Sequence, residues 1–149
     1  MRFDTKLAIV VRDDLQTWQK LNVTAFLAGA VAAGGDEVIG EPYEDASGGK
    51  YLAMFVQPVL VFVGSAEQLT VAYGRAVAHR LRLGIFTEEL FGTDNDADNR
   101  SAVAAVPAES LRLAGLALHD SGASSTRSSG ACRSIRSPAE DLGVFAANG

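Results

Sequence analysis

Cysteine, histidine and lysine are scarce in this 149-residue chain, which holds one cysteine, two histidines and three lysines. The single cysteine, Cys132, cannot form an internal disulfide, and no cysteine–histidine cluster has the spacing of a zinc site. The glycine-rich phosphate loops GxGxxG and GxxxxGK are also absent. The sequence therefore predicts no metal and no cofactor, and a reducing cytoplasm fits the cysteine content best.

Long hydrophobic runs are lacking as well. The most apolar stretch, residues 21–33, is interrupted by Asn22 and Thr24, and it is shorter than the roughly 20 residues that span a bilayer. The amino end shows neither the basic start nor the small-residue cleavage site of a signal peptide. We therefore expect a cytoplasmic protein without a membrane partner.

Positive charge is in short supply. The net charge is −5, and residues 1–119 carry 15 acidic against 10 basic side chains, whereas residues 120–149 carry three of each. Proteins that bind nucleic acid draw affinity from lysine and arginine, which neutralise phosphates. The composition thus argues against a nucleic-acid partner.

The remaining pattern alternates strands with helices. Strands are predicted at residues 6–12, 57–63, 83–86 and 111–118, helices at 15–33, 65–81 and 97–106, and a loop or irregular hairpin at 40–55. Because parallel strands need long crossovers and helices supply them, this order predicts an α/β domain. The first two strands read as buried on both faces. In the first helix, Trp18, Leu21 and Ala25 open an apolar face that is predicted to enter the core.

The composition changes after His119. Residues 1–119 are predicted to form one domain, whereas residues 120–149 hold seven of the 11 serines and no sustained apolar period. Two interpretations of this segment stay open. It is either a disordered tail, as its composition favours, or the out-of-frame translation of a GC-rich gene.

Polar residues gather where the first predicted strand meets the first helix. Asp13 and Asp14 follow the strand, and Lys20 and Asn22 lie near the start of the helix. Ligands of open α/β sheets bind outside the carboxyl ends of the strands. There Lys20 could hold a carboxylate, a phosphate or a developing oxyanion, and Asn22 could donate a neutral hydrogen bond. In a plainer interpretation, Asp14 caps the helix, Lys20 is solvated and Trp18 belongs to the core.

A second polar group follows the third predicted strand. A carboxylate near a lysine can serve as a general base, and neighbours on an extended chain point to opposite sides, so only one of Glu88 and Glu89 should face a site. Further on, residues 94–99 read DNDADN, like the start of a calcium loop. Asn99 and Ala105 stand where such a loop has glycine and glutamate. Helix capping explains this segment better.

Three segments carry a family resemblance over residues 6–119: KLAIVVRDDLQTWQKLNVTAFLAG, PVLVFVGSAEQLTVAYGRAVAHRLRLGIFTEELF and LRLAGLAL. Together with GEPYED from Gly40 and AVAAVPAE from Ala102, they resemble an uncharacterised bacterial domain of unknown function that is related to the type II peptidyl-tRNA hydrolases. The resemblance implies a three-layer α/β/α fold with a four-stranded mixed sheet whose last strand runs antiparallel. It also implies the homodimer that the hydrolases form.

The hydrolases carry a functional lysine, and a functional acid and threonine further along the chain. The resemblance places Lys20 at or one residue from that lysine, and Thr87 or Glu88 at the acidic position. Thr24 or Ala25 stands where the hydrolases have a glutamine, and Leu27 or Ala28 where they have a histidine. The glycines of their first segment have no counterpart.

Taken together, these observations predict a cleft at the ends of the first and third strands that binds a small polar or acyl ligand. We expect Lys20 and Glu88 to be catalytic, and the ligand-binding residues to be Asp13, Asp14, Asn22 and Thr87. The alternative is a hydrolase of an ester or amide, similar to peptidyl-tRNA hydrolase, in which Lys20 stabilises the oxyanion.

Overall fold

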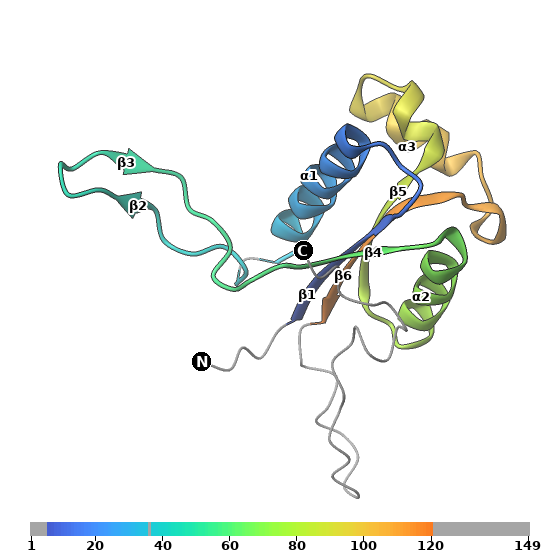
Figure 1. Cartoon of the computed structure of the whole chain (residues 1–149), viewed down its shortest axis with the longest axis horizontal. Helices are drawn as coiled ribbons and strands as arrows, with labels where there is room; N and C mark the ends of the chain where they lie inside the picture. The colour runs from blue at the N-terminus through green and yellow to red at the C-terminus, as the bar shows by residue number, and fades with distance from the viewer. Residues whose placement is uncertain (1–5, 36, 121–149) are drawn as a thin grey trace, which may run out of the picture.

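The computed structural model describes residues 6–35 and 37–120. Its elements follow one another as β1 (Lys6–Arg12), α1 (Thr17–Ala33), β2 (Tyr43–Glu44), β3 (Lys50–Tyr51), β4 (Leu60–Gly64), α2 (Ala66–Ala78), β5 (Arg82–Thr87), the 3-10 helix η1 (Glu88–Gly92), α3 (Asp96–Ala104), the 3-10 helix η2 (Ala108–Ser110) and β6 (Leu113–Asp120). The predicted α/β order is confirmed (Figure 1). Apart from Asp120, which ends β6, the segment 120–149 lies outside the described residues.

Four strands form one mixed sheet in the order β4-β1-β6-β5. β1 and β4 are parallel, whereas β6 runs antiparallel to both of its neighbours, β1 and β5. The expectation of a four-stranded mixed sheet with an antiparallel last strand is confirmed. Because β6 is inserted between β1 and β5, the carboxyl ends of the first and third predicted strands are separated by the start of β6.

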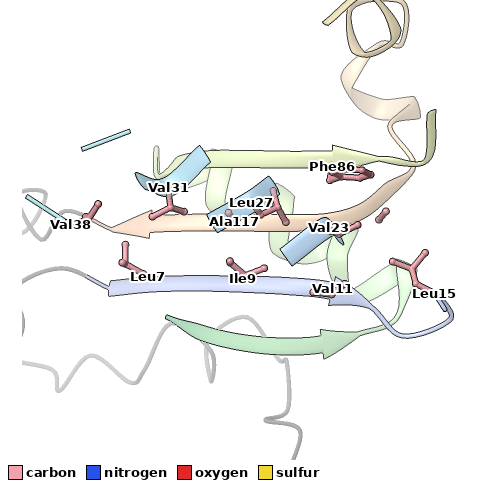
Figure 2. Packing of buried hydrophobic residues seen from close by; sticks show 11 residues of the cluster. Leu7, Ile9, Val11, Leu15, Val23, Leu27, Val31, Val38, Phe86 and Ala117 are labelled. Carbon is pink, nitrogen blue, oxygen red and sulfur yellow. The ribbon is translucent and has the colours of Figure 1, made fainter. Parts of the chain in front are cut away.

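Helix α1 covers one face of the sheet. Its buried side chains Val23, Leu27 and Val31 lie over β1 and β6 (Figure 2). The approach is close because β6 carries a glycine there: a Cβ atom added to Gly115 would lie 2.4 Å from Val23 Cγ1 and 2.8 Å from Leu27 Cδ1. A larger residue at this position would force the helix away from the sheet.

Helix α2 covers the opposite face, which completes three layers. It buries Leu69, Ala72 and Ala76 against side chains of β1 and β6. Ser65 followed three residues later by Gln68 has the spacing of a capping box, and α2 begins with one. The Ser65 backbone N–H donates to Gln68 Oε1 (2.8 Å), and the Gln68 N–H donates to Ser65 Oγ (3.2 Å). Local sequence thus fixes both the start and the inner face of α2.

The prediction for the second strand is wrong in its start and in its burial. The strand begins at Leu60 instead of Gln57, and it forms an edge of the sheet. Leu60 and Val61 remain 44% and 46% exposed. A continuous apolar run is typical of a central strand, but strand order depends on pairings that are distant in the sequence.

The predicted core face of α1 is also wrong. Trp18 is 58% and Leu21 66% exposed, and Ala25 faces solvent with them. Because α1 is apolar on nearly every side, its period could not distinguish the face that meets the sheet from the face that does not. Among the described residues, no helix is long and apolar enough to cross a bilayer.

The expected hairpin is confirmed at β2 and β3, which project from the body of the domain (Figure 1). Asp45 holds its turn by accepting hydrogen bonds from the Ser47 N–H (2.8 Å), the Gly49 N–H (3.0 Å) and the Tyr51 hydroxyl (2.6 Å). These hydrogen bonds lower the pKa of Asp45, and the Tyr51 hydroxyl has the largest effect. Gly48 has a φ of 84°, a conformation that favours glycine.

Candidate functional site

A cluster of alternating charges marks the end of β1. Arg12 donates from Nε to Asp14 Oδ1 (2.6 Å), and from Nη1 to Glu88 Oε1 (2.5 Å) and to the Leu113 carbonyl (3.3 Å). Burial alone would lower the pKa of Arg12, but the two carboxylates outweigh it and raise that pKa. Arg12 therefore ties β1 to the start of β6 and to η1.

Arg112 extends this cluster from the other side. It pairs with Glu88 Oε2 (3.1 Å) and with Glu89 Oε1 (2.9 Å), so each oxygen of Glu88 has its own arginine. The pKa of Glu89 is lowered, first by its own backbone N–H and then by Arg112. The backbone N–H of Glu88 also donates to the Arg112 carbonyl (3.0 Å). These contacts fix the position of η1.

Thr87 is buried between these charges and the core. Its side chain is 1% exposed, and its hydroxyl has no hydrogen bond of ordinary geometry with a described residue. After the backbone N–H of Glu89 and Arg112, this hydroxyl also contributes to lowering the pKa of Glu89. Since Phe86 faces α1, the alternation along β5 turns Thr87 toward the α2 side of the sheet.

The structure does not bring all the predicted site residues together. Asp14 and Glu88 share the ion cluster through Arg12, and Asp14 pairs there instead of capping α1, which begins after Gln16. The Asp13 side chain is exposed, while its N–H donates to the Gly64 carbonyl (2.9 Å). Lys20 is half-buried on α1 and forms no ion pair with a described residue, Glu88 included.

A pocket of about 300 Å³ lies beside the cluster, between the first turns of α1, η1 and the start of α3. Its walls are formed by Trp18, Asn22, Phe26, Phe86, Leu90, Phe91, Thr93, Asp94, Asn95, Asp96 and Asn99. The volume is at the lower limit of sites for small organic ligands. Of the predicted residues, Asn22 alone lines this pocket.

Aromatic rings form the floor and one side of the pocket. Phe86 lies in the middle, with ring centroids 5.6 Å from Phe26 and 5.1 Å from Phe91, and Phe91 lies 6.1 Å from Trp18. Phe86 is buried, whereas Trp18 and Phe26 are 58% and 55% exposed. The row of rings thus begins and ends at exposed side chains, and the buried Phe86 connects it to the core.

Polar side chains form another part of the lining, which we call the rim: Asn22, Thr93, Asp94, Asn95, Asp96 and Asn99. The side chain of Asn95 caps α3 by accepting from the Asp98 N–H (2.9 Å), which confirms helix capping in the DNDADN segment. Asp96 pairs with Arg100, and Thr93 hydrogen-bonds to Asn99. Asp94 accepts only from Asn95 Nδ2 (3.2 Å) and forms no ion pair with a described residue.

Sequence reasoning missed most of this pocket. Phe26 and Phe91 gave no signal of their own, because apolar residues in a helix and after a strand are most simply read as core. The DNDADN segment did stand out, but its neighbours in space could not be inferred. The one available sign was the apolar character of α1 on both sides.

Other places in the described structure offer less to a ligand. A hollow at the opposite end of the sheet, lined by residues that include Leu7 and Phe62, has a volume of about 20 Å³ and holds little more than one water. Within residues 6–35 and 37–120, no three histidine, cysteine or acidic side chains gather as a metal site would require.

Comparison with known proteins places the chain in a family. The family described as "Protein of unknown function (DUF2000)" matches residues 5–125. The chain is also similar to a solved structure of a protein of unknown function, Atu0240 from Agrobacterium tumefaciens strain C58. The two chains are 38% identical, with a TM-score of 0.78, and the match covers 80% of this chain and 89% of the other. No curated protein matches the chain significantly. The chain belongs to the DUF2000 family.

Proposed function

We propose that this domain binds a small ligand in the pocket between α1, η1 and α3. The observation that carries the proposal is the row of four aromatic rings, which ends in two large and largely exposed side chains, Trp18 and Phe26. A concave site with aromatic walls and a few convergent polar groups is the usual form of a small-molecule site. The rim residues Asn22, Asp94 and Asn99 would supply those polar groups.

The place of the pocket in the fold supports the same proposal. It lies at the carboxyl end of β5, where ligands of open α/β sheets are commonly bound. Figure 1 shows α3 beside the amino-terminal end of α1 at this end of the sheet. Ligand would therefore meet the end of a strand, the first turns of a helix and a short connecting segment.

The ion cluster would act as a support for the pocket. Arg12 and Arg112 hold Glu88 and Glu89 at the start of η1, and the same short helix carries Leu90 and Phe91 into the pocket wall. The wall is held by hydrogen bonds from the end of β1 and from the residue that precedes β6, so it loses little entropy when a ligand binds. In this view Glu88 is a positioning residue.

A relation to the type II peptidyl-tRNA hydrolases remains part of the proposal, supported by the sheet whose last strand runs antiparallel. Hydrolysis would draw on Lys20, which forms no ion pair with a described residue. Glu88, its expected partner, already binds an arginine through each oxygen. This pairing favours binding over hydrolysis.

The proposal can be tested with a panel of small amines, alcohols, carboxylates, esters and amides added to the full chain. Trp18 is the only tryptophan in the sequence, so its fluorescence reports directly from the mouth of the pocket. We expect at least one compound to change this fluorescence and to raise Tm. A compound at 100 times its Kd would stabilise the fold by about 2.7 kcal/mol.

Variants separate the pocket from the rest of the surface. Asn22→Phe should fill the pocket and abolish both responses, whereas the matched control Thr70→Phe on the exposed side of α2 should leave them unchanged. Chromatography of the mixture should recover the compound intact from the wild type and from Lys20→Ala. Equal binding by Asn22→Phe and wild type would contradict the proposed site, and consumption that requires Lys20 would replace binding with hydrolysis.

A further inference from the structure

We propose that the ligand of this pocket is a small organic cation, an amine or quaternary ammonium with an apolar body. The inference rests on the proposed function and names the chemistry that the pocket recognises. Two features of the pocket lining carry the inference: the negative charge of the rim and the aromatic rings that form most of the rest of the lining.

The rim carries one negative charge that forms no ion pair with a described residue, that of Asp94. Among the described residues that line the pocket, Asp94 and Asp96 are charged and none is basic. Asp96 is engaged by Arg100, which leaves the Asp94 carboxylate free to pair with a ligand. A positive group placed at this rim would be attracted by Asp94, whereas a carboxylate or phosphate would be repelled.

The two arginines of the ion cluster do not reverse this charge. Arg12 pairs with Asp14 and Glu88. Arg112 pairs with Glu88 and Glu89. Neither arginine lines the pocket. A carboxylate or phosphate ligand would find no unpaired guanidinium group in this cluster, because each of the two arginines already pairs with two carboxylates. The structure therefore assigns the pocket to a cation.

The aromatic side of the pocket suits the same ligand. The faces of aromatic rings are electron-rich and attract cations, and tryptophan does so most strongly. The exposed ring of Trp18 lies on the same pocket as Asp94. An ammonium group between them would gain from both, while an apolar body could cover Phe26 and Phe91 and exclude water from these rings.

Three probes of nearly equal shape test the inference through Trp18 fluorescence: phenethylammonium, 2-phenylethanol and phenylacetate, which carry charges of +1, 0 and −1 at pH 7. We expect phenethylammonium to bind about five- to tenfold more tightly than the alcohol, and phenylacetate to bind more weakly than both. Raising the ionic strength should reduce the difference in affinity between phenethylammonium and the alcohol, because salt screens the interaction between charges that are exposed to solvent.

Two variants assign the effect to its source. Asp94→Asn keeps the acceptor for Asn95 and removes the charge. It should therefore weaken the binding of phenethylammonium toward the affinity of the alcohol, retain the part of the preference that is due to the Trp18 ring, and leave the affinity for the alcohol unchanged. Glu41→Gln removes one exposed carboxylate at the base of the distant hairpin and should change neither affinity. Together the two variants separate a local contact from the general acidity of the domain.

The outcomes distinguish the two proposals. Equal affinities for cation and alcohol, or tighter binding of phenylacetate, would overturn the cation inference while the pocket remained a binding site. The absence of any response to all three probes at millimolar concentration, with no response to the wider panel, would overturn both. A Trp18 signal that follows protein concentration instead of the probe would show that a second copy of the chain covers the rings, and would overturn the cation inference.

Discussion

Helices α1 and α2 each pack on one face of the sheet, but their sequences differ on the side that faces solvent. α2 is amphipathic: it buries Leu69, Ala72 and Ala76 and turns much of its polar surface to solvent. α1 buries Val23, Leu27 and Val31 in an equivalent way, yet it also exposes large apolar side chains, Trp18, Leu21 and Phe26.

This difference separates what folding requires from what it does not. A helix needs one apolar stripe to pack on a sheet, and both helices have it. The exposed apolar side chains of α1 lie outside its buried stripe, and two of them, Trp18 and Phe26, line a pocket with η1 and α3. Helix α2 also exposes apolar side chains, Val71 and Val77, but these are smaller and line no such pocket. The larger exposed apolar surface of α1, and its place at the pocket, point to a binding role for α1.

The largest effect should come from the inward faces, where the two helices are alike. Leu27→Ala and Leu69→Ala should each lower the free energy of unfolding by about 2 to 5 kcal/mol, because both side chains are fully buried. Leu21→Ala on the outward face of α1 should change it by less than about 0.5 kcal/mol. Urea unfolding measures all three, and a large loss in Leu21→Ala would show that the outward face is packed after all.

The glycine beneath α1 offers a second test. In Gly115→Val the new side chain would clash with Val23 and Leu27. This overpacking should lower the free energy of unfolding by about 1 to 3 kcal/mol. Chemical denaturation again supplies the measurement. If the variant were as stable as the wild type, α1 could not approach β6 as closely as the structure shows.

A matched pair of exposed glycines compares the outward faces. A Cβ atom at Gly29 of α1 or at Gly74 of α2 would meet nothing within 4 Å. Replacing either with alanine should therefore raise the free energy of unfolding by about 0.5 to 1 kcal/mol through helix propensity. Stabilisation by Gly74→Ala together with destabilisation by Gly29→Ala would reveal a partner packed on α1.

The smallest effect concerns the ion cluster that supports η1. The pKa of Glu89 lies below its ordinary value of 4.5, so its ionised form stabilises the fold above that pH, and this contribution disappears as the pH falls through the lowered value. The Tm of the wild type should slightly exceed that of Glu89→Gln at pH 7, and the difference should shrink as the pH is lowered below 4.5. A difference that stayed constant with pH would mean that the charge of Glu89 does not matter.

Local signals predicted much of the fold. The buried run at residues 6–12 became β1, and the Ser65 and Gln68 capping box marked the start of α2. Each signal depends on residues close together in the chain. The edge position of β4 and the insertion of β6 between β1 and β5 depend on pairings across most of the chain, and no local pattern contains them.

The same reasoning explains the outcome for the site. Asp14 and Glu88 were predicted at the ends of strands because strand ends can be read from the sequence. Arg12, which was not among the predicted site residues, brings the two carboxylates together. The pocket was missed because its walls come from α1, η1 and α3, whose contact is set by tertiary packing. The orientation of α1 was the decisive unknown, since its two sides are nearly equally apolar.

The most direct test of the central claim is a map of amide chemical-shift changes in the isotope-labelled full chain as phenethylammonium is added. If the cation binds in the pocket, we expect the largest chemical-shift changes at Asn22, Phe91 and Asn95. The amides of α2 and of the β2–β3 hairpin should not change. Changes centred on Lys20 and Glu88, or spread evenly over the surface, would contradict this expectation.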